Sequence, residues 1–304
     1  MTNAEYLEAV EKRHSRRAYR QKPLGSEIMQ IIKEMVKAVN KDANLDFTFI
    51  EDATPFFKIF SGKFSMIVIA GPDTQKARES CGYYGESIVL QCVYHGLGTC
   101  WVSGTYNENK VYEALHLPSD KRIYAVITIG YAKDKYSLVE KTMYNATHKK
   151  NKSYQDMFEF CDAKLPEAYA YGMKLVEMAP SAVNRRPVHF RYENGILSGY
   201  VDEPYSDKSV DFGIAKLHFL IGVRAKGING KWSLDNSFEE YGGQRIKFTP
   251  DKAEGEEDGY GKNRKEKVVK KEKNTCYRFE HCCFSFGCDD LCGSRRAEMV
   301  LHSR

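Results

Sequence analysis

Three short clusters in the sequence hold the residue types needed to bind a phosphate and a flat ring. The first is Arg13-His14-Ser15-Arg16-Arg17, which gathers guanidinium groups, an imidazole and a hydroxyl. Guanidinium groups bind phosphate through charge-assisted, often bidentate hydrogen bonds, and a serine hydroxyl can donate another. The alternative is a solvent-exposed basic helix end whose arginines complement the helix dipole. The cluster alone leaves both interpretations open.

The second cluster is Gly96-Leu97-Gly98-Thr99-Cys100-Trp101. Its two glycines would let the backbone approach a flat ligand closely, but they could equally form the C-cap and turn after a helix. Trp101 could stack on a ring, although a tryptophan in such a place more often packs in the core.

The third cluster, Pro180-Ser181-Ala182-Val183-Asn184, lies past the midpoint of the chain. Pro180 would end a helix, and the small residues after it would keep bulk away from the space above the turn. Asn184 offers a donor and an acceptor in one planar amide, which suits the edge of a heteroaromatic ring. The alternative is an ordinary helix-to-strand loop with an Asn turn.

The length and composition of the chain limit the class of protein to which it can belong. The chain has 304 residues, which predicts one large or two moderate domains, and its 42% apolar content is that of a globular protein. The start is polar and no apolar stretch reaches the length of a membrane span, so we expect a cytoplasmic protein. A net charge of +5 is modest for this length and is not by itself evidence for nucleic-acid binding. It is equally compatible with an anionic small ligand.

Periodicity and turn signals predict an α+β fold. A capping box, Thr2-Asn3-Ala4-Glu5, begins the first helix, and Asn194-Gly195 predicts a type I′ hairpin. Helix 75–95 is apolar on more than one face, which predicts a central position. The lysine-rich stretch 132–154 is expected to be a linker. The other helices are expected at 26–39, 109–115, 167–178 and 209–222, and the strands at 47–50, 66–70, 100–102, 124–131, 188–192 and 196–201.

Together and in this order, the clusters resemble the nitroreductase family of flavin-dependent oxidoreductases over residues 5–222. Arg13-His14-Ser15-x-Arg17 is similar to that family's flavin-phosphate motif, and residues 96–104 are similar to its G-L-G-x-x-W segment. Ile129-Gly130-Tyr131 is similar to its I-G-Y strand end, and residues 180–187 to its P-S-x-x-N-x-Q-P-W motif. The resemblance implies a nitroreductase-like fold of mixed sheets flanked by helices, with FMN as the cofactor.

The resemblance also implies roles for individual residues around the FMN. Ser103 and Gly104 would lie near the reactive N5 atom. Arg186 stands where the family has glutamine; it would stabilise the anionic reduced ring, or it would point into solvent. The expected phosphate contacts are Arg13, His14, Ser15 and Arg17, with Lys150 and Lys152 as a second basic pair or part of a flexible linker, and the expected ring contacts are Pro180, Ser181, Ala182 and Asn184.

Two departures from the family pattern imply a fused pseudo-dimer. Ordinary members are homodimers in which one chain supplies the phosphate motif and the other the P-S-x-x-N turn. Here the first half lacks proline and serine at Val36-Lys37-Ala38-Val39-Asn40, and the second half begins at Cys161 without an R-x-S-x-R pattern. We expect halves at residues 1–145 and 146–248, one FMN per chain, and function as a monomer.

The activity implied is an FMN-dependent NAD(P)H oxidoreductase with a ping-pong mechanism. The acceptor would be a nitroaromatic, a quinone or a similar small molecule, and the nicotinamide would need no dinucleotide-binding fingerprint because it only visits the site. The alternative is a non-catalytic flavin-binding or redox-sensing protein, which the missing second site and the altered Gln-Pro-Trp motif motivate.

The remaining segment, 249–304, is expected to be separate from the fold. Residues 252–273 are dominated by charge and predicted to be disordered, and their interleaved lysines and glutamates make nucleic acid an unlikely partner. The five tail cysteines could hold zinc or an iron–sulfur cluster, but their spacing matches no known template, so an extension without a metal is favoured. They are Cys276, Cys282, Cys283, Cys288 and Cys292. The other four, Cys81, Cys92, Cys100 and Cys161, are expected to be reduced core thiols.

Overall fold

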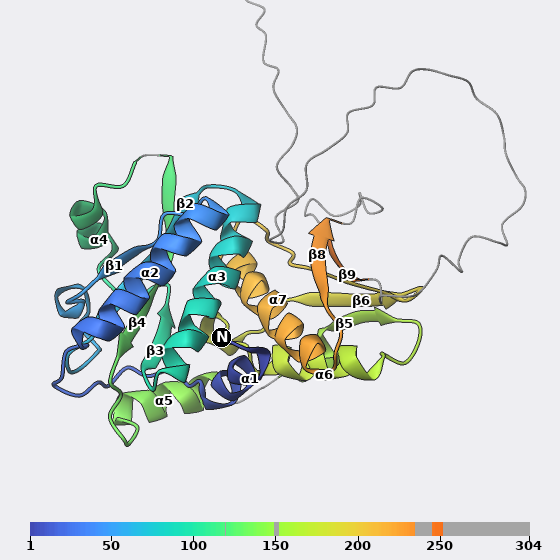
Figure 1. Cartoon of the computed structure of the whole chain (residues 1–304), viewed down its shortest axis with the longest axis horizontal. Helices are drawn as coiled ribbons and strands as arrows, with labels where there is room; N and C mark the ends of the chain where they lie inside the picture. The colour runs from blue at the N-terminus through green and yellow to red at the C-terminus, as the bar shows by residue number, and fades with distance from the viewer. Residues whose placement is uncertain (119, 149–151, 235–244, 252–304) are drawn as a thin grey trace, which may run out of the picture. The chain divides into compact units, whose positions relative to one another are not determined.

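The two sheets are connected in the same way. The first has the strand order β1-β2-β4-β3 and the second the order β5-β6-β7-β9-β8 (Figure 1). In each, an antiparallel pair is followed by a long helix, an edge strand and a strand that returns to the middle. The second sheet has one extra strand, β5, which runs parallel to β6 at the edge.

The computed structural model describes residues 1–118, 120–148, 152–234 and 245–251. The strands are β1 (Thr48–Ile50), β2 (Ser65–Pro72), β3 (Gly98–Val102), β4 (Lys121–Gly130), β5 (Phe158–Cys161), β6 (His189–Glu193), β7 (Ile196–Tyr200), β8 (Gly230–Leu234) and β9 (Ile246–Pro250). The helices are α1 (Asn3–Lys12), α2 (Ser26–Ala43), α3 (Gln75–Tyr94), α4 (Glu108–Leu115), α5 (Leu138–Thr147), α6 (Glu167–Met178) and α7 (Lys208–Ala225), with short 3-10 turns η1 (Thr54–Phe56), η2 (Gln155–Met157) and η3 (Ala182–Asn184).

The two long helices α3 and α7 end in the same way. Each is followed by a glycine in the left-handed region, Gly96 with φ 76° and Gly227 with φ 78°. Each glycine is followed, at the same distance along the chain, by a tryptophan in an edge strand, Trp101 in β3 and Trp232 in β8. A positive φ favours glycine, so the two positions share one backbone requirement. Gly96 of the second cluster therefore serves in the turn that ends α3, whereas Gly98 begins β3, where an added Cβ would lie 2.7 Å from Cβ of Ala132.

Helices α3 and α7 cross with their backbones in direct contact. A Cβ atom added to Gly82 of α3 would lie 2.0 Å from the carbonyl oxygen of Val210, and one added to Gly213 of α7 would lie 1.9 Å from that of Glu79. Each glycine thus meets the residue three positions before the other glycine. This reciprocal pattern is what a local two-fold axis between two equivalent helices produces.

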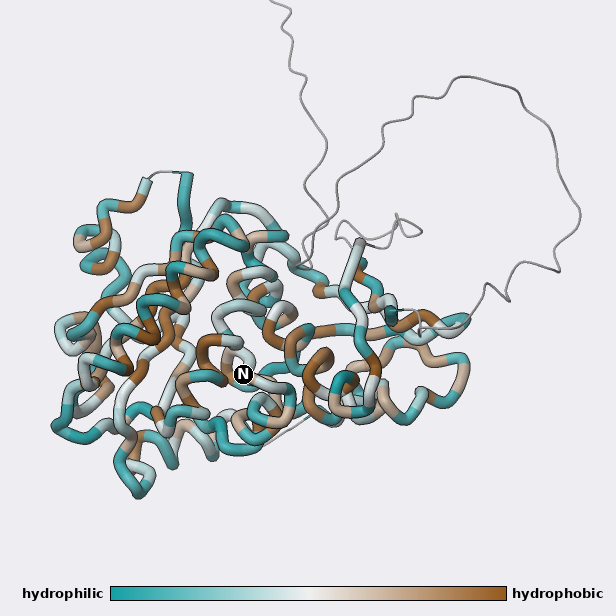
Figure 2. Tube along the Cα trace, in the orientation of Figure 1, coloured by the Kyte–Doolittle hydropathy of each residue, from teal (hydrophilic) through white to brown (hydrophobic). Residues whose placement is uncertain are grey.

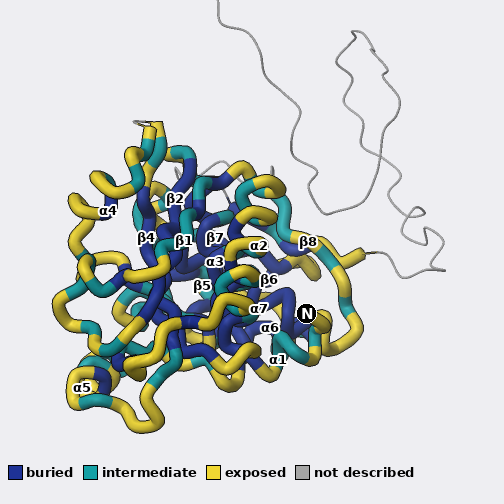
Figure 3. The backbone as a smooth tube through the Cα atoms, turned by 60° about the vertical axis from the view of Figure 1, so that its left-hand side comes forward, coloured by how far each residue is buried: buried dark blue, intermediate teal, exposed yellow. Residues whose placement is uncertain are grey.

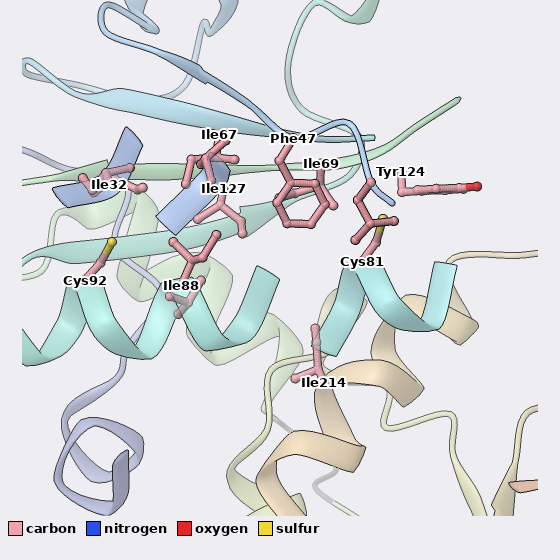
Figure 4. Packing of buried hydrophobic residues seen from close by; sticks show 14 of the residues in the cluster. Ile32, Phe47, Ile67, Ile69, Cys81, Ile88, Cys92, Tyr124, Ile127 and Ile214 are labelled. Carbon is pink, nitrogen blue, oxygen red and sulfur yellow. The ribbon is translucent and has the colours of Figure 1, made fainter. Parts of the chain in front are cut away.

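Helix α3 lies between the first sheet and α7, as its apolar pattern predicted. Ile88 of α3 approaches Ile67 and Ile127 of the sheet and Cys92 lies near Ile32 of α2, while Ile214 of α7 lies on the other side of the helix (Figure 4). Hydrophobic residues gather along α7 and the adjoining strands (Figure 2). The core is continuous across the crossing, because residues of both helices belong to the same buried cluster.

Most predicted elements are confirmed. Every predicted helix and strand is present with its ends shifted by a few residues, and Asn194 and Gly195 have φ values of 51° and 79°, as a type I′ hairpin requires. The strands β5, β8 and β9 were not predicted. Among the described residues, no helix is long and apolar enough to span a membrane.

Two predictions are wrong. The expected linker 132–154 contains α5, whose capping box joins Ser137 and Glu140. Figure 3 shows α5 largely exposed, so it lacks the apolar stripe that periodicity detects. Cys161 is exposed on the edge strand β5, whereas the other three thiols are buried as expected. Lys150, the segment 252–273 and the tail cysteines lie outside the described residues.

The helix crossing leads to a first prediction. Gly82→Ala would force α3 and α7 apart, because the new methyl group would overlap a backbone carbonyl that cannot rotate away. We expect a loss of about 3 kcal/mol in the free energy of unfolding, measured by chemical denaturation. Gly25→Ala is the matched control, because nothing lies within 4 Å of its added Cβ. Equal stability of the two variants would contradict this account of the crossing.

Candidate functional site

The first cluster runs alongside the second. Helix α1 ends at Lys12, and the backbone becomes extended at Arg13, with φ −67° and ψ 121°. Ser15 then forms a parallel β-bridge with Thr99, and the N–H of Arg16 donates to the Thr99 carbonyl at 2.8 Å. The basic cluster is therefore an extended segment beside β3 from Ser15 onwards, while Arg13 is the C-cap residue of α1, so a helix-end role remains for Arg13.

Glu140 holds this segment from the N-terminal end of α5. One carboxylate oxygen accepts hydrogen bonds from the backbone N–H of Arg17 at 2.7 Å and from Nε of Arg16 at 3.1 Å. The other accepts from the N–H of Ser137 at 2.7 Å. Burial alone would raise the pKa of this carboxyl group, but these donors outweigh it and lower the pKa to about 2. Sequence reasoning missed Glu140, although Ser137-x-x-Glu140 was a readable capping box.

The arginines of the first cluster differ in what they bind. Arg16 is engaged by Glu140, by the Lys133 carbonyl and by the ring of Tyr136, so it is a structural residue. The guanidinium of Arg17 makes no hydrogen bond or ion pair within the described ranges. Nε of Arg13 is buried beside Glu86 and Nη2 donates to the Met178 carbonyl, whereas Nη1 makes no hydrogen bond within the described ranges. Two of the three guanidinium groups therefore keep donors for a ligand.

His14 and Ser15 complete the cluster. Partial burial, together with the charges of Arg13 and Arg16, lowers the pKa of His14. Ser15 is half-buried in its bridge with Thr99. The predicted phosphate motif thus forms one compact basic surface.

A hydrogen bond joins the first cluster to the end of α6, directly before the third cluster. Nη2 of Arg13 donates to the carbonyl of Met178 at 3.3 Å, and Met178 is the last residue of α6, immediately before the turn at 179–187. The two clusters are 165 residues apart in the chain along this bond. This contact depends on the tertiary structure, and no local sequence pattern predicts it.

Asp211 of α7 holds the turn that follows α6. Its carboxylate accepts the N–H of Ala182 at 3.1 Å and pairs with the guanidinium of Arg185 at 3.1 Å. Burial raises the pKa of Asp211 to about 7, although Arg185 and the Ala182 N–H favour its charged form. Within the turn, Ser181 Oγ accepts the N–H of Arg186 at 3.0 Å. Sequence reasoning missed Asp211, since nothing near the turn indicates a partner on α7.

The backbone of this turn is strained. Val183, Asn184 and Arg186 have φ values of 46°, 57° and 46°. A left-handed conformation costs a residue other than glycine about 1–2 kcal/mol, and it is rare for a β-branched side chain such as that of Val183. The valine is 74% exposed, so packing does not compensate for the strain. Strained backbone of this kind clusters at binding sites.

Asn184 and Arg186 bind the protein's own carbonyl groups. Nδ2 of Asn184 donates to the carbonyl of Thr147, the last residue of α5, at 3.2 Å. Arg186 donates to the carbonyls of Glu177, at 2.7 Å, and Lys152, and burial lowers the pKa of its guanidinium. Arg186 is half-buried and does not extend into solvent. The side chain of Lys152 is exposed.

The second cluster leads to an open surface. Ser103 and Gly104 follow β3 and are both exposed, and no atom lies within 4 Å of a Cβ added to Gly104. Trp101, two residues earlier, is half-buried, and its Nε1 donates to Glu86 of α3 at 2.7 Å. Its indole packs into the notch left by Gly85, where an added Cβ would lie 2.5 Å from the ring. Trp101 is therefore a packing residue that supports the strand before Ser103. In the described part of the chain, no three His, Cys, Asp or Glu side chains group to hold a metal ion.

The anchoring by Glu140 leads to a prediction about acid stability. Because its folded pKa lies below the ordinary value of 4.5, its contribution to the free energy of unfolding is complete above about pH 4.5 and lost as pH falls towards 2. Glu140→Gln should cost about 3 kcal/mol at pH 7, and the two proteins should converge near pH 2. Urea titrations at several pH values measure this, with exposed Glu8→Gln as the control. A difference that is independent of pH would refute the assignment.

Asp211 predicts the opposite pH dependence. Its folded pKa of about 7 lies above the ordinary 3.8, so the folded state holds a proton that the unfolded state loses near pH 4. This carboxyl group therefore contributes most below about pH 4, and the contribution falls as pH rises towards 7, by up to about 4 kcal/mol. Asp211→Asn should flatten the stability curve between pH 5 and 7, followed by thermal unfolding. An unchanged slope would be inconsistent with this proposal.

Comparisons with known proteins agree with this architecture. The family model described as "Putative TM nitroreductase" matches residues 5–223. A crystal structure of "a putative nitroreductase" from Thermotoga maritima matches with a TM-score of 0.54 at 20% identity, covering 82% of this chain and 94% of its own, which shows a shared fold. No curated protein matches the chain.

Two shorter structures match with lower scores. A nitroreductase family protein from Clostridium novyi covers 42% of this chain and 86% of its own at 23% identity, with a TM-score of 0.36. A nitroreductase with bound FMN from Bacteroides fragilis covers 44% and 91% at 16% identity, with a TM-score of 0.35. Because the family model spans well over half of the sequence, including all three clusters, the chain belongs to the nitroreductase family.

Proposed function

We propose that this protein is an FMN-dependent NAD(P)H oxidoreductase that reduces a small acceptor such as a nitroaromatic or a quinone. The observation that carries the proposal is the hydrogen bond from Arg13 to the Met178 carbonyl. It joins the basic cluster, suited to a phosphate, to the small-residue turn, suited to the edge of a flavin ring. One ligand with a phosphate at one end and a flat ring at the other would contact both.

The donors around this junction fit the phosphate of FMN. The guanidinium of Arg17 has no partner in the described part of the chain, and Nη1 of Arg13 makes no hydrogen bond with any described residue. Ser15 adds a hydroxyl, and the exposed side chain of Lys152 adds a positive charge. A phosphate would satisfy the guanidinium groups with charge-assisted bonds. Lys150, which we also propose as a phosphate contact, lies outside the described residues.

The residues proposed for the ring end leave one side open. Pro180, Ser181 and Ala182 form a turn with small side chains, and Asp211 holds this turn by accepting the N–H of Ala182. Ser103 and Gly104 are exposed with open space above Gly104. FMN, when bound, would supply hydride acceptance from the nicotinamide and electron delivery to the acceptor, and the chain's residues would hold it and shape its open face.

We further propose that residues 1–145 and 146–248 are two fused halves that form one site. The matching strand orders and the reciprocal contact of Gly82 and Gly213 support this. The first half supplies the basic cluster and the second the turn, and neither repeats the other's motif. One FMN per chain and a functional monomer follow from this arrangement.

Arg186 supports a second candidate, a flavin-binding protein without turnover. Its hydrogen bonds go to the carbonyls of Glu177 and Lys152, so these donors are not available to the ring. A protein that binds FMN in this way could act as a redox sensor.

The visible absorption spectrum of the full chain, reconstituted with FMN, tests the proposal. We expect about one FMN per chain and bleaching of its bands on anaerobic addition of NADH or NADPH. Arg17→Ala should weaken FMN binding about 10- to 100-fold, because it removes charged hydrogen bonds. Arg20→Ala is the control, since Arg20 pairs with Asp134 at the surface.

Each other outcome has a definite meaning. Bound FMN that neither nucleotide reduces would favour the second candidate. Two FMN molecules per chain would rule out the single site, and a chain that binds no FMN would refute the proposal.

A further inference from the structure

A buried polar cluster lies directly behind the basic segment. Glu86 of α3 and His218 of α7 are both 0% exposed, with Oε1 and Nε2 3.0 Å apart. Removing a carboxyl group from water costs free energy unless its oxygens are hydrogen-bonded. Both oxygens of Glu86 therefore need hydrogen-bond partners. The Glu86 cluster consists of Glu86, His218, Trp101 and Arg13.

His218 fixes one oxygen of Glu86. Nδ1 of the imidazole lies 3.0 Å from the carbonyl of Leu175 in α6, and because a carbonyl only accepts, Nδ1 carries a hydrogen. The contact between Nε2 and Oε1 then contains one proton, carried either by the imidazole or by the carboxyl group. In both cases a hydrogen bond ties Glu86 to α7 and, through Leu175, to α6.

Trp101 fixes the other oxygen. Its Nε1 is a donor only and lies 2.7 Å from Oε2 of Glu86. The carboxyl plane of Glu86 is therefore held at both ends by groups from separate elements, α7 and β3. A carboxyl group with a fixed orientation can in turn orient a third side chain that contacts it.

That third partner is Arg13. Its Nε, which makes no hydrogen bond within the described ranges, lies within ion-pair distance of Oε1 of Glu86 at 3.8 Å, and its Nη2 donates to the Met178 carbonyl. Nη1 makes no hydrogen bond with any described residue. Because a guanidinium group is planar and rigid, holding its Nε and Nη2 sides sets the direction of Nη1.

We propose that Glu86 is a positioning residue for the cofactor phosphate: held by His218 and Trp101, it aims the free nitrogen of Arg13 at the phosphate of FMN. This inference rests on the proposed function for the identity of the ligand. It assigns Glu86 no contact with the flavin.

The same helix provides a matched control. Glu79 is also buried in α3 and also reaches across to α7, where Lys216 binds it at 2.6 Å. Among the described residues its hydrogen-bond partners are Lys216 and Gln75, and Arg13 is not one of them. A general effect of losing a buried carboxylate between the helices would appear in both variants, whereas an effect through Arg13 would appear only at Glu86.

Binding of FMN and of riboflavin to the full chain, measured by quenching of flavin fluorescence, tests the proposal. Riboflavin has the same ring but no phosphate. Glu86→Gln should weaken FMN binding about 10-fold and leave riboflavin binding unchanged, because one charged hydrogen bond is misdirected. Glu79→Gln should leave the ratio of the two affinities at the wild-type value. An equal loss for both flavins, or none, in Glu86→Gln would overturn the proposal.

Two further measurements keep the test independent of turnover and of folding defects. Exchange of the Arg13 Nε proton, followed by NMR without flavin, should be at least about 10-fold faster in Glu86→Gln than in wild type. Unchanged exchange would overturn the positioning role even if FMN binds, whereas faster exchange in a chain that binds no FMN would refute only the proposed function. Arg13→Lys, which lacks Nε, should also lower FMN affinity selectively, and an unchanged affinity would count against the proposal.

Discussion

The close crossing of α3 and α7 is the constraint on which the rest of the structure depends. Glycine at positions 82 and 213 lets the two backbones touch, and a side chain at either would collide with a carbonyl oxygen. The contact places the first sheet and its helix against the second half of the chain. Both Glu86 and Asp211 lie on these two helices, so their positions relative to the clusters follow from the crossing.

Three buried carboxyl groups hold the segments of the candidate site in place around the helix crossing. Glu140 gathers the backbone of the basic segment, Asp211 gathers the turn after α6, and Glu86 lies behind Arg13, where the two meet. Each accepts hydrogen bonds from other elements of the fold, which outweigh the cost of burial at Glu140 but not at Asp211. Because their partners differ, their pKa values move in different directions: that of Glu140 falls to about 2 and that of Asp211 rises to about 7.

Local sequence rules predicted the elements well and the site incompletely. The hairpin at Asn194-Gly195 and the buried helix α3 follow from turn chemistry and apolar patterning, which act over a few residues. Hydrophobic periodicity did not predict helix α5, because only Glu140 along it is buried. Its stability comes from a capping box and from the hydrogen bonds of Glu140 to the basic segment rather than from an apolar face. Cys161 looked like a core residue because its neighbours are apolar, but an edge strand leaves it exposed.

The sequence by itself determined the three clusters, the α+β character and the resemblance to flavin enzymes, because residue types and short spacings are local properties. Only the tertiary structure decided which members of the clusters are free to bind. Arg16 and Arg17 are neighbours, yet Glu140 and Tyr136 bind the guanidinium of Arg16, whereas the guanidinium of Arg17 has no partner among the described residues. Burial and hydrogen bonding are set by groups more than a hundred positions away, and no local pattern carries that information.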